Sequence, residues 1–306
     1  MIQSPLNYTG GKYKLLPQIL PLFPKEIDVF VDLFCGGCNV GINVKSNRVI
    51  YNDIDPHLTY LYHTLKHLDK ECVLEYIYQI IEKYHLSLVS KYGYAHYHCD
   101  SSKGLGRYNK EKYLKLRADF NEKYASGSFD DYANVMLYVL IVYAFNNQIR
   151  FNGNGAFNLP VGKRDFNKKM EKKLSAFIDK IQEQECSFTC CDFRNFDISA
   201  LTPQDFVYID PPYLITCAPY NEQGGWDEAA EQDLLSFLDG LHAQKIRFAL
   251  SNVLRSKGKE NKLLLAWLEK NADRYKASAL AYSYSNSNYQ TKDRNSASEE
   301  VLIINY

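Results

Sequence analysis

The chain has 306 residues, 46% of them hydrophobic and 24% charged, so neither wholesale disorder nor a fibrous repeat fits its composition. Its 36 Lys and Arg balance its 36 Asp and Glu, which excludes a uniformly basic coat for nucleic acid but permits local basic patches. This length is that of two domains, and it suffices to bury a core without disulfides or metal staples.

The first residues lack the charged-then-apolar pattern of a signal peptide, and the longest apolar run, 135–145, suits a buried helix and is too short to span a membrane. Eight cysteines are present, but no His pair lies near them at zinc-binding spacing. We therefore expect a cytoplasmic protein with reduced thiols, no metal site and no membrane partner.

The N-terminal quarter predicts the start of an open α/β sheet. A short apolar strand at 28–33 precedes a glycine-bearing turn and an apolar stretch, interpreted as a helix, that ends near residue 44. A second strand at 48–51 ends at Asn52 and Asp53. Strand, turn, helix and strand, with an acid after the second strand, is the order found in nucleotide-binding sheets.

The next hundred residues predict a mostly helical insertion with one hairpin. A Gly- and Asn-rich stretch at 148–162 has hairpin character. Helical periodicity without a convincing strand between the segments marks the rest: 58–68, 73–84, 110–124 and 132–145.

The α/β alternation resumes with a helix from 168 to about 184. Short apolar strands follow it at 187–191, 206–209, 246–251, 280–284 and 301–304. We therefore place an α/β domain at 1–56 and 166–306 and the insertion at 57–165.

Charge supports this division. The stretch 103–123 holds seven basic residues against three acidic ones, and 150–173 holds seven against two, whereas 222–239 holds six acids and no base. A single run of this kind is usually a solvated face. Two basic stretches that flank one Asn-rich hairpin favour a polyanionic partner.

The sharpest motif is Asp210-Pro211-Pro212-Tyr213, directly after the strand at 206–209. Ligands of open α/β sheets bind outside the carboxyl ends of the strands. The two prolines fix φ and remove two backbone donors, so the nearby carbonyls have no competing N–H groups. A carboxylate, a rigid carbonyl and an aromatic ring can together hold a planar ring that bears an amino group. The alternative is a Pro-Pro loop that merely ends an edge strand.

A second motif, Asp32-Leu33-Phe34-Cys35-Gly36-Gly37, ends the first strand. Its glycines let a cofactor approach the backbone, although a tight βα turn explains them equally well. Because Cys38 and Asn39 follow, it is not a GxGxxG dinucleotide fingerprint. Asp53 suits two ribose hydroxyls, and Asp192-Phe193 offers an acceptor and an apolar face for an adenine ring.

Together these motifs resemble the Dam-like (D12 class, alpha group) DNA adenine-N6 methyltransferases, which use S-adenosylmethionine (AdoMet). The resemblance runs nearly end to end. It includes the Gly-Gly-Lys segment near the N-terminus, the glycine motif, the ribose-binding acid, the catalytic tetrapeptide, the DNA-reading hairpin and a later strand, at 7–12, 32–37, 52–55, 210–213, 145–162 and 248–252.

The resemblance implies an α/β fold: a Rossmann-like AdoMet-dependent methyltransferase sheet with an inserted, mostly helical target-recognition domain that contains a β-hairpin. It also implies base flipping, because an exocyclic amine inside a duplex cannot meet the methyl donor. Asp210 and the Pro211 carbonyl would accept the amine hydrogens, Pro212 would keep the loop rigid, and Tyr213 would stack on the flipped base. No cysteine would form a covalent intermediate.

Two further sets of residues follow from the resemblance. The AdoMet-binding set is Tyr8, Gly11, Lys12, Asp32, Phe34, Gly36, Gly37, Asp53, Ile54, Asp192, Phe193 and Asp210. The DNA-binding set is Asn147, Gln148, Arg150, Asn152, Asn158, Lys163 and Tyr220.

The chain departs from the family pattern at three positions. Cys38 stands where a third glycine is common, Gln148 where some relatives carry an apolar residue, and Lys163 where an Arg is frequent. Gln can read a base edge by hydrogen bonds, and Lys does not replace Arg at a bidentate site. The target sequence therefore does not follow from the resemblance.

We expect a monomer that acts on double-stranded DNA, with a cognate restriction endonuclease as a further partner, in a restriction-modification or phage/host DNA-protection setting. Three alternatives stay open: cytosine-N4 methylation by the same chemistry, a DNA-binding protein without activity, and a nicotinamide-dependent oxidoreductase on a similar sheet. The intact tetrapeptide argues against the second, and the missing GxGxxG spacing against the third.

Overall fold

The computed structural model describes residues 1–8, 10–127, 129–216, 225–281 and 298–306. The chain forms two compact units. The helical unit comprises Met1–Gly11, Gly36–Asn43 and Asp55–Phe188. The sheet unit comprises Lys12–Cys35, Val44–Ile54 and Thr189–Tyr306.

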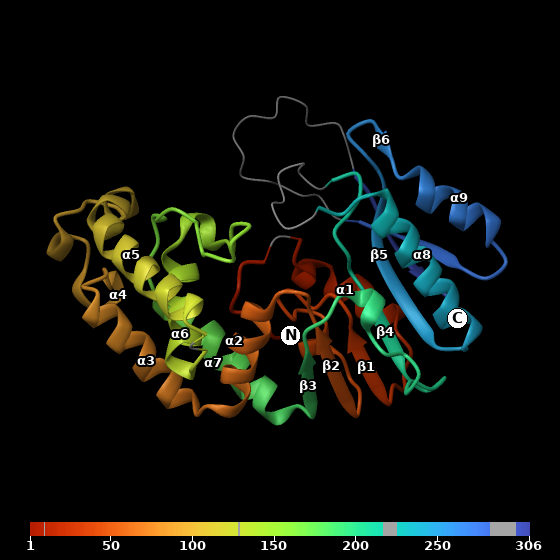
Figure 1. The fold of residues 1–306 in the computed structure, drawn as a ribbon, viewed down its shortest axis with the longest axis horizontal. Coiled ribbons are helices and arrows are strands. Elements are labelled where there is room, and N and C mark those ends of the chain that lie inside the picture. Colours follow the sequence, from red (N-terminus) through yellow and green to blue (C-terminus); the bar gives the residue numbers. More distant parts are fainter. Residues whose placement is uncertain (9, 128, 217–224, 282–297) are drawn as a thin grey trace. The chain divides into compact units, whose positions relative to one another are not determined.

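One sheet organises the sheet unit. Its strands run in the order β3-β2-β1-β4-β5-β8-β7 (Figure 1), with β6 paired to β5. The pairs β1–β2, β1–β4 and β4–β5 are parallel, whereas β8 and β7 form an antiparallel edge. The strands are β1 (Val29–Asp32), β2 (Arg48–Asn52), β3 (Cys186–Thr189), β4 (Phe206–Ile209), β5 (Arg247–Ser256), β6 (Lys259–Glu260), β7 (Lys276–Leu280) and β8 (Glu299–Ile304).

Apolar strands covered on both faces place the core of the sheet unit. On one face, α8 (Glu228–Ala243) and α9 (Lys262–Lys270) pack against β5 and against each other, as Figure 1 shows. Phe23 makes ring contacts with Phe30 of β1 and with Phe206 and Tyr208 of β4. These contacts anchor the preceding segment, which contains α1 (Leu16–Ile19), to the sheet. Burial on both faces explains why these strands are apolar at successive positions.

The strand order fixes where a ligand can approach. Strand β1 pairs with β2 on one side and with β4 on the other. The strand order therefore reverses direction between β1 and β4. In open α/β sheets this switch point leaves a crevice at the carboxyl ends of the strands. Asp32 ends β1 and Asp210 follows β4, so both acids belong to that edge.

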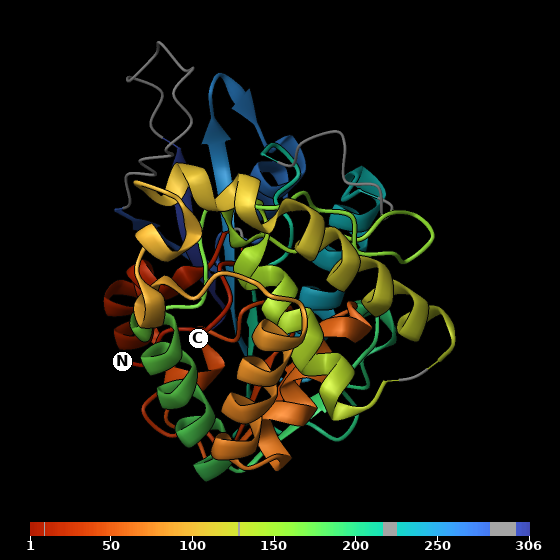
Figure 2. The same cartoon turned by 90° about the vertical axis from the view of Figure 1, so that its left-hand side faces the viewer.

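The helical unit is built around α6 (Asp131–Tyr143), which is buried from Ala133 to Tyr143 and packs against α2, α3 and α5. A helix that is apolar on every side has to be covered by neighbours, and Figure 2 shows α6 among the other helices of this unit. The prediction of a buried helix here is confirmed. The other helices are α2 (Pro56–His67), α3 (Lys70–Lys83), α4 (Val89–Tyr92), α5 (Ser102–Ala125) and α7 (Lys168–Glu183).

The predicted helix between the first glycine turn and residue 44 is wrong. The segment is a loop that ends in a 3-10 turn at Gly41–Asn43. Gly36 and Cys38 have φ of 45° and 57°, so the chain reverses twice before a helix can start. The Asn39 side chain then accepts a hydrogen bond from the backbone N–H of Ser4, which fixes the loop from outside.

The strand predicted at 280–284 is displaced, because β7 runs from Lys276 and ends at Leu280, while 282–284 lie outside the described residues. The remaining predicted strands are confirmed to within a few residues. No helix within the described ranges has the length and apolarity needed to cross a bilayer.

Candidate active site and nucleic-acid interface

Asp210 receives two donors on a single oxygen. The Lys12 ammonium lies 3.0 Å from Asp210 Oδ1, and the Tyr213 hydroxyl donates to the same oxygen at 2.8 Å. Lys12 is only 3% exposed, and its Nζ lies 4.9 Å from the centre of the Tyr213 ring. Among the described residues, Asp210 Oδ2 has no hydrogen-bond partner, so one carboxylate oxygen is left for an incoming donor.

The protonation states of Asp210 and Tyr213 suit a carboxylate that accepts a hydrogen bond from an incoming donor. Burial raises the pKa of Asp210 above its ordinary value, while the Lys12 charge and the Tyr213 hydroxyl oppose the rise. Burial and the neighbouring carboxylates of Asp210 and Glu300 raise the pKa of Tyr213 well above its ordinary value. Tyr213 therefore stays a neutral donor, and Asp210 is a stronger base than an exposed aspartate.

The prolines of the tetrapeptide differ in exposure: Pro211 is buried and Pro212 is exposed. Pro211 follows the end of β4, where the chain leaves the sheet. A buried proline here holds its own carbonyl in a fixed position, because its ring locks φ and the peptide after it is again a proline.

Glu300 belongs to the same cluster and was missed in the sequence. It lies in β8, with its Oε1 3.5 Å from Lys12 Nζ and 3.4 Å from the Tyr213 hydroxyl. An acid within a strand that is otherwise apolar from 301 to 303 is the signal that could have drawn attention to it.

The ends of β1 and β2 are held together by Asn52. Its amide donates to the carbonyls of Leu33 and Cys191, each at 3.0 Å, and its Oδ1 accepts from the Thr189 hydroxyl at 2.8 Å. Beside it, Asp53 is buried at the end of β2. Asn52 thus fixes the geometry of this edge.

Ring contacts bring two predicted cofactor residues together with one that was missed. Phe34 and Phe193 have ring centroids 5.5 Å apart, and the Trp226 ring lies 5.8 Å from Phe34 and 5.7 Å from Phe193. Phe193 is buried, while Phe34 and Trp226 are half-buried and offer apolar surface. Both oxygens of Asp192 accept hydrogen bonds from Arg194, one from its backbone N–H and one from its guanidinium.

In the helical unit, the N-terminal segment packs against the turn that follows β1. A Cβ on Gly36 would lie 2.7 Å from the Tyr8 ring, so glycine is required there for packing as well as for its φ. Gly11 donates its backbone N–H to the Tyr8 carbonyl at 3.1 Å. Gly37 is packed against Ser4 and Tyr8. These contacts assemble four of the predicted cofactor residues; Ile54, in the sheet unit, is 65% exposed.

The predicted hairpin is present as a ladder of backbone hydrogen bonds. Phe145 donates to the Pro160 carbonyl at 2.9 Å, and Asn158 donates to the Arg150 carbonyl at 3.1 Å. Its side chains alternate as in a strand. Phe151, Phe157 and Leu159 point inward and are buried, whereas Arg150 is exposed and Asn152 and Asn158 are half-buried.

Helix α5 holds the hairpin from below. Tyr113 and Arg117 donate to the Leu159 carbonyl at 3.1 and 2.8 Å, and Asn121 exchanges two hydrogen bonds with the Phe157 backbone at 3.1 and 2.9 Å. These three residues lie four apart, on one helix face. The His57 ring stacks on Phe151 with centroids 3.5 Å apart and on Tyr124 of α5 with centroids 4.2 Å apart.

The predicted DNA-binding residues divide into exposed and structural positions. Arg150 donates its Nε to Asn158 Oδ1 at 2.7 Å, and Asn152 Oδ1 accepts from Asn154 and Ala156 across the turn. Asn147 is buried, and its amide donates to the Val142 carbonyl, so it fixes the start of the hairpin.

Three members of that set remain. Lys163 is exposed and Gln148 is half-buried. Tyr220 lies outside the described residues.

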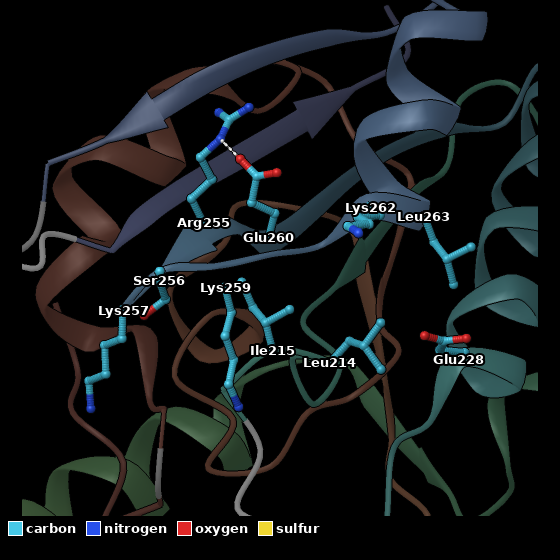
Figure 3. Close-up of a pocket in the computed structure, with 11 residues that line it drawn as sticks. Leu214, Ile215, Glu228, Arg255, Ser256, Lys257, Lys259, Glu260, Lys262 and Leu263 are labelled. Carbon is cyan, nitrogen blue, oxygen red and sulfur yellow. Dashed lines mark hydrogen bonds and ion pairs between the residues drawn. The ribbon is translucent and has the colours of Figure 1, made fainter.

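An open groove of about 980 Å³ follows the tetrapeptide at 210–213, bounded by Leu214 and Ile215 and by the β5–β6 turn (Figure 3). Lys257 and Lys259 extend in the same direction from this turn, as Figure 3 shows, and Arg255 pairs with Glu260 at 2.8 Å. The groove is lined by four cations and two acids: Arg255, Lys257, Lys259 and Lys262 against Glu228 and Glu260.

A second groove, of about 730 Å³, lies beside the amino ends of the strands and is also lined by two lysines, Lys25 and Lys45. Only the groove beside the carboxyl ends adjoins the tetrapeptide. Its excess of cations suits a phosphate chain.

Comparison with known proteins identifies relatives of this sequence. The profile of the D12 class N6 adenine-specific DNA methyltransferases matches residues 8–283. Over the whole of this chain, the sequence is 42% identical to the type II methyltransferase M.FokI of Planomicrobium okeanokoites and 39% identical to the modification methylase StsI of Streptococcus sanguinis. It is 26% identical to the DNA adenine methylase of Escherichia coli K12, over 81% of this chain and 79% of that protein.

The extent of these matches differs. The chain spans 43% of the length of M.FokI and 43% of StsI.

Proposed function

Because the chain belongs to the D12 class of N6 adenine-specific DNA methyltransferases, we propose that it transfers a methyl group from AdoMet to the exocyclic N6 of an adenine in duplex DNA. The observation that carries this proposal is the Asp210 carboxylate. Its Oδ1 takes both internal donors, Lys12 and Tyr213, which leaves Oδ2 for the amine of a substrate base.

The chemistry follows from these groups. Asp210 Oδ2 and the Pro211 carbonyl accept the two amine hydrogens, so the nitrogen lone pair turns out of the ring plane toward the methyl donor. The nitrogen gains a bond to carbon and must lose one proton. Asp210, whose pKa burial raises, is placed to accept that proton. Tyr213 contributes its ring face to stacking, and the target base has to leave the duplex to reach this edge.

The residues present fit AdoMet, which supplies the methyl group when bound. The buried acids Asp32 and Asp53 stand at the ends of β1 and β2, where a ribose is commonly held in sheets of this kind. The Phe34 and Trp226 rings offer apolar surface for an adenine. Gly36 lets the turn pass close to Tyr8, as a site that brings the backbone near a ligand requires.

Recognition of DNA is assigned to the hairpin and to the basic groove. Outward positions of the hairpin carry Arg150, Asn152 and Asn158, whose donors and acceptors suit base edges and phosphates. In the sheet unit, Lys257 and Lys259 lie beside the segment that follows the tetrapeptide, where the backbone of the strand bearing the flipped base would pass.

The relatives suggest the biological setting. Two of them are named as a type II methyltransferase and a modification methylase, so we propose that this chain protects DNA from a companion restriction endonuclease. It would act as a monomer in the cytoplasm of a bacterial or phage-infected cell, where its DNA substrate is found.

The experiment that tests the proposal is nucleoside mass spectrometry of unmethylated duplex DNA after incubation with the protein and AdoMet. N6-methyladenine is expected. N4-methylcytosine would keep the mechanism and replace the base, because the same acceptors serve any exocyclic amine. DNA without a methylated base, in a sample that binds AdoMet and DNA, would overturn the proposed activity and favour a DNA-binding protein.

A further inference from the structure

At the carboxyl ends of the strands, a buried carboxylate, Glu300, and a half-buried one, Asp210, share the ammonium of Lys12. Lys12 Nζ lies 3.0 Å from Asp210 Oδ1 and 3.5 Å from Glu300 Oε1. With all three groups ionised the cluster carries one net negative charge, whereas Lys12 and Asp210 alone would form a neutral pair. Glu300 therefore decides the sign of the local charge.

Holding Glu300 in this position costs stability. Its side chain is 2% exposed, and among the described residues its Oε2 has no hydrogen-bond partner. A buried carboxylate oxygen without a donor is destabilising, and the residues that follow Glu300 in β8 are apolar. If position 300 had only a structural role, an apolar side chain or an amide there would give a more stable fold than a carboxylate.

We propose that Glu300 is a positioning residue for methyl transfer: it shares Lys12 with Asp210, so that the lysine orients the aspartate without neutralising it. This inference rests on the proposed function. The amine nitrogen gains positive charge as its lone pair forms the new bond to carbon. A cluster with a net negative charge stabilises that change more than a neutral ion pair does.

Glu300 also reaches Tyr213. Its Oε1 lies 3.4 Å from the hydroxyl that donates to Asp210 at 2.8 Å, so the Tyr213 proton has two possible acceptors and the shorter bond goes to Asp210. The same carboxylate thus contacts both donors that occupy Asp210 Oδ1. Loss of its charge should strengthen the hold of Lys12 on Asp210 and weaken Asp210 as an acceptor for the amine.

The test compares Glu300→Gln with Glu299→Gln. Glu299 is the preceding residue of β8, is exposed and pairs with Arg255 at 2.8 Å, which makes it a matched control. The target site is first mapped with the wild-type protein. The measurements are then the single-turnover rate constant for methylation of an unmethylated duplex that contains this site, the Kd values for AdoMet and DNA, and Tm. Single turnover isolates the transfer from product release.

We expect Glu300→Gln to lower the single-turnover rate constant by roughly tenfold to a hundredfold. Both Kd values should stay within about twofold and Tm should not fall, because the amide keeps the shape and removes a buried carboxylate whose Oε2 has no donor among the described residues. Glu299→Gln should match the wild type. Glu300→Asp, which keeps the charge, should retain more of the rate than Glu300→Gln.

Three results would overturn the inference: a wild-type rate constant in Glu300→Gln, a loss explained by a lower Tm or a weaker Kd, or a lower rate in Glu300→Asp than in Glu300→Gln. These results are distinct from failure of the proposed function. In that case the wild-type protein itself would leave no methylated base on DNA.

Discussion

The carboxyl-end edge of the sheet unit and the hairpin of the helical unit are built on opposite principles. At the edge of the sheet, charged groups bind one another with little exposure: Lys12 and Glu300 are buried and Asp210 is half-buried. In the hairpin, apolar side chains are buried and the polar ones are exposed or half-buried, with Phe157 inside and Arg150 outside.

The difference fits the roles proposed for the two sites. A buried ion cluster keeps fixed charges in a medium of low dielectric, where they act strongly on a reacting atom. A surface that reads DNA must exchange water for base edges and phosphates, so its polar groups stay accessible and its rigidity has to come from below. Helix α5 supplies that rigidity through Asn121 and its neighbours.

Among the variants of the two regions, the largest effect is expected for Asp210 at the edge of the sheet. Asp210→Ala removes the acceptor of the amine hydrogens and should lower the methylation rate constant by roughly a thousandfold or more. DNA binding, measured by gel shift, should persist because it depends on the hairpin. Asp197→Ala, an exposed aspartate of the sheet unit, is the control. Residual activity above about a tenth of wild type would contradict the assigned role.

The pH dependence sharpens the same side of the comparison. The ionised form of Asp210 accepts the amine, and burial raises its pKa above the ordinary value of 3.8. The methylation rate constant should therefore fall as pH drops through the raised pKa, about tenfold per pH unit below it. Single-turnover rates in buffers of constant ionic strength measure this limb. An acid limb at or below pH 3.8 would show that burial does not govern this carboxylate.

On the hairpin side, Arg150→Ala should weaken DNA binding and leave AdoMet binding unchanged. A bidentate contact to a base is worth about 1–3 kcal/mol, and its loss should also relax specificity at one position of the site. Fluorescence anisotropy with the cognate duplex and single-base variants measures both effects. Arg274→Ala, in the sheet unit, is the control. An equal loss on every sequence would reassign Arg150 to a phosphate.

Charge reversal in the basic groove tests whether DNA contacts extend beyond the hairpin. Lys257→Glu with Lys259→Glu should weaken DNA binding by roughly tenfold and reduce the slope of log K against log salt by about 2, near 1 per lost phosphate contact. The matched control reverses Lys25 and Lys45, which line the groove at the amino ends of the strands. Equal effects of both pairs would indicate a general charge effect.

The smallest effect is expected below the hairpin. Asn121→Ala removes two hydrogen bonds to the Phe157 backbone and should lower the free energy of unfolding by about 1–2 kcal/mol. Urea unfolding measures this, with Lys115→Ala, an exposed residue of α5, as the control. An unchanged free energy of unfolding together with unchanged DNA specificity would show that α5 does not set the hairpin's conformation.

Local patterns were sufficient wherever a site lies at the end of a strand. Runs of apolar residues predicted β1 and β4, and with them the positions of Asp32 and Asp210. The Gly- and Asn-rich composition of 148–162 likewise predicted the hairpin, in which Phe151 pairs with Phe157. The pattern failed after Gly36, where apolar residues suggested a helix but backbone reversals at positive φ prevented one.

The sequence by itself determined most of the strands and helices, the tetrapeptide at a strand end and the position of the hairpin, because each depends on residues that are close along the chain. Only the tertiary structure decided which charges share the catalytic edge. Glu300 lies 87 residues after Tyr213 and reaches it because β8 returns antiparallel beside β5. Local periodicity does not predict such a pairing, because the pairing depends on the order of the strands in the sheet.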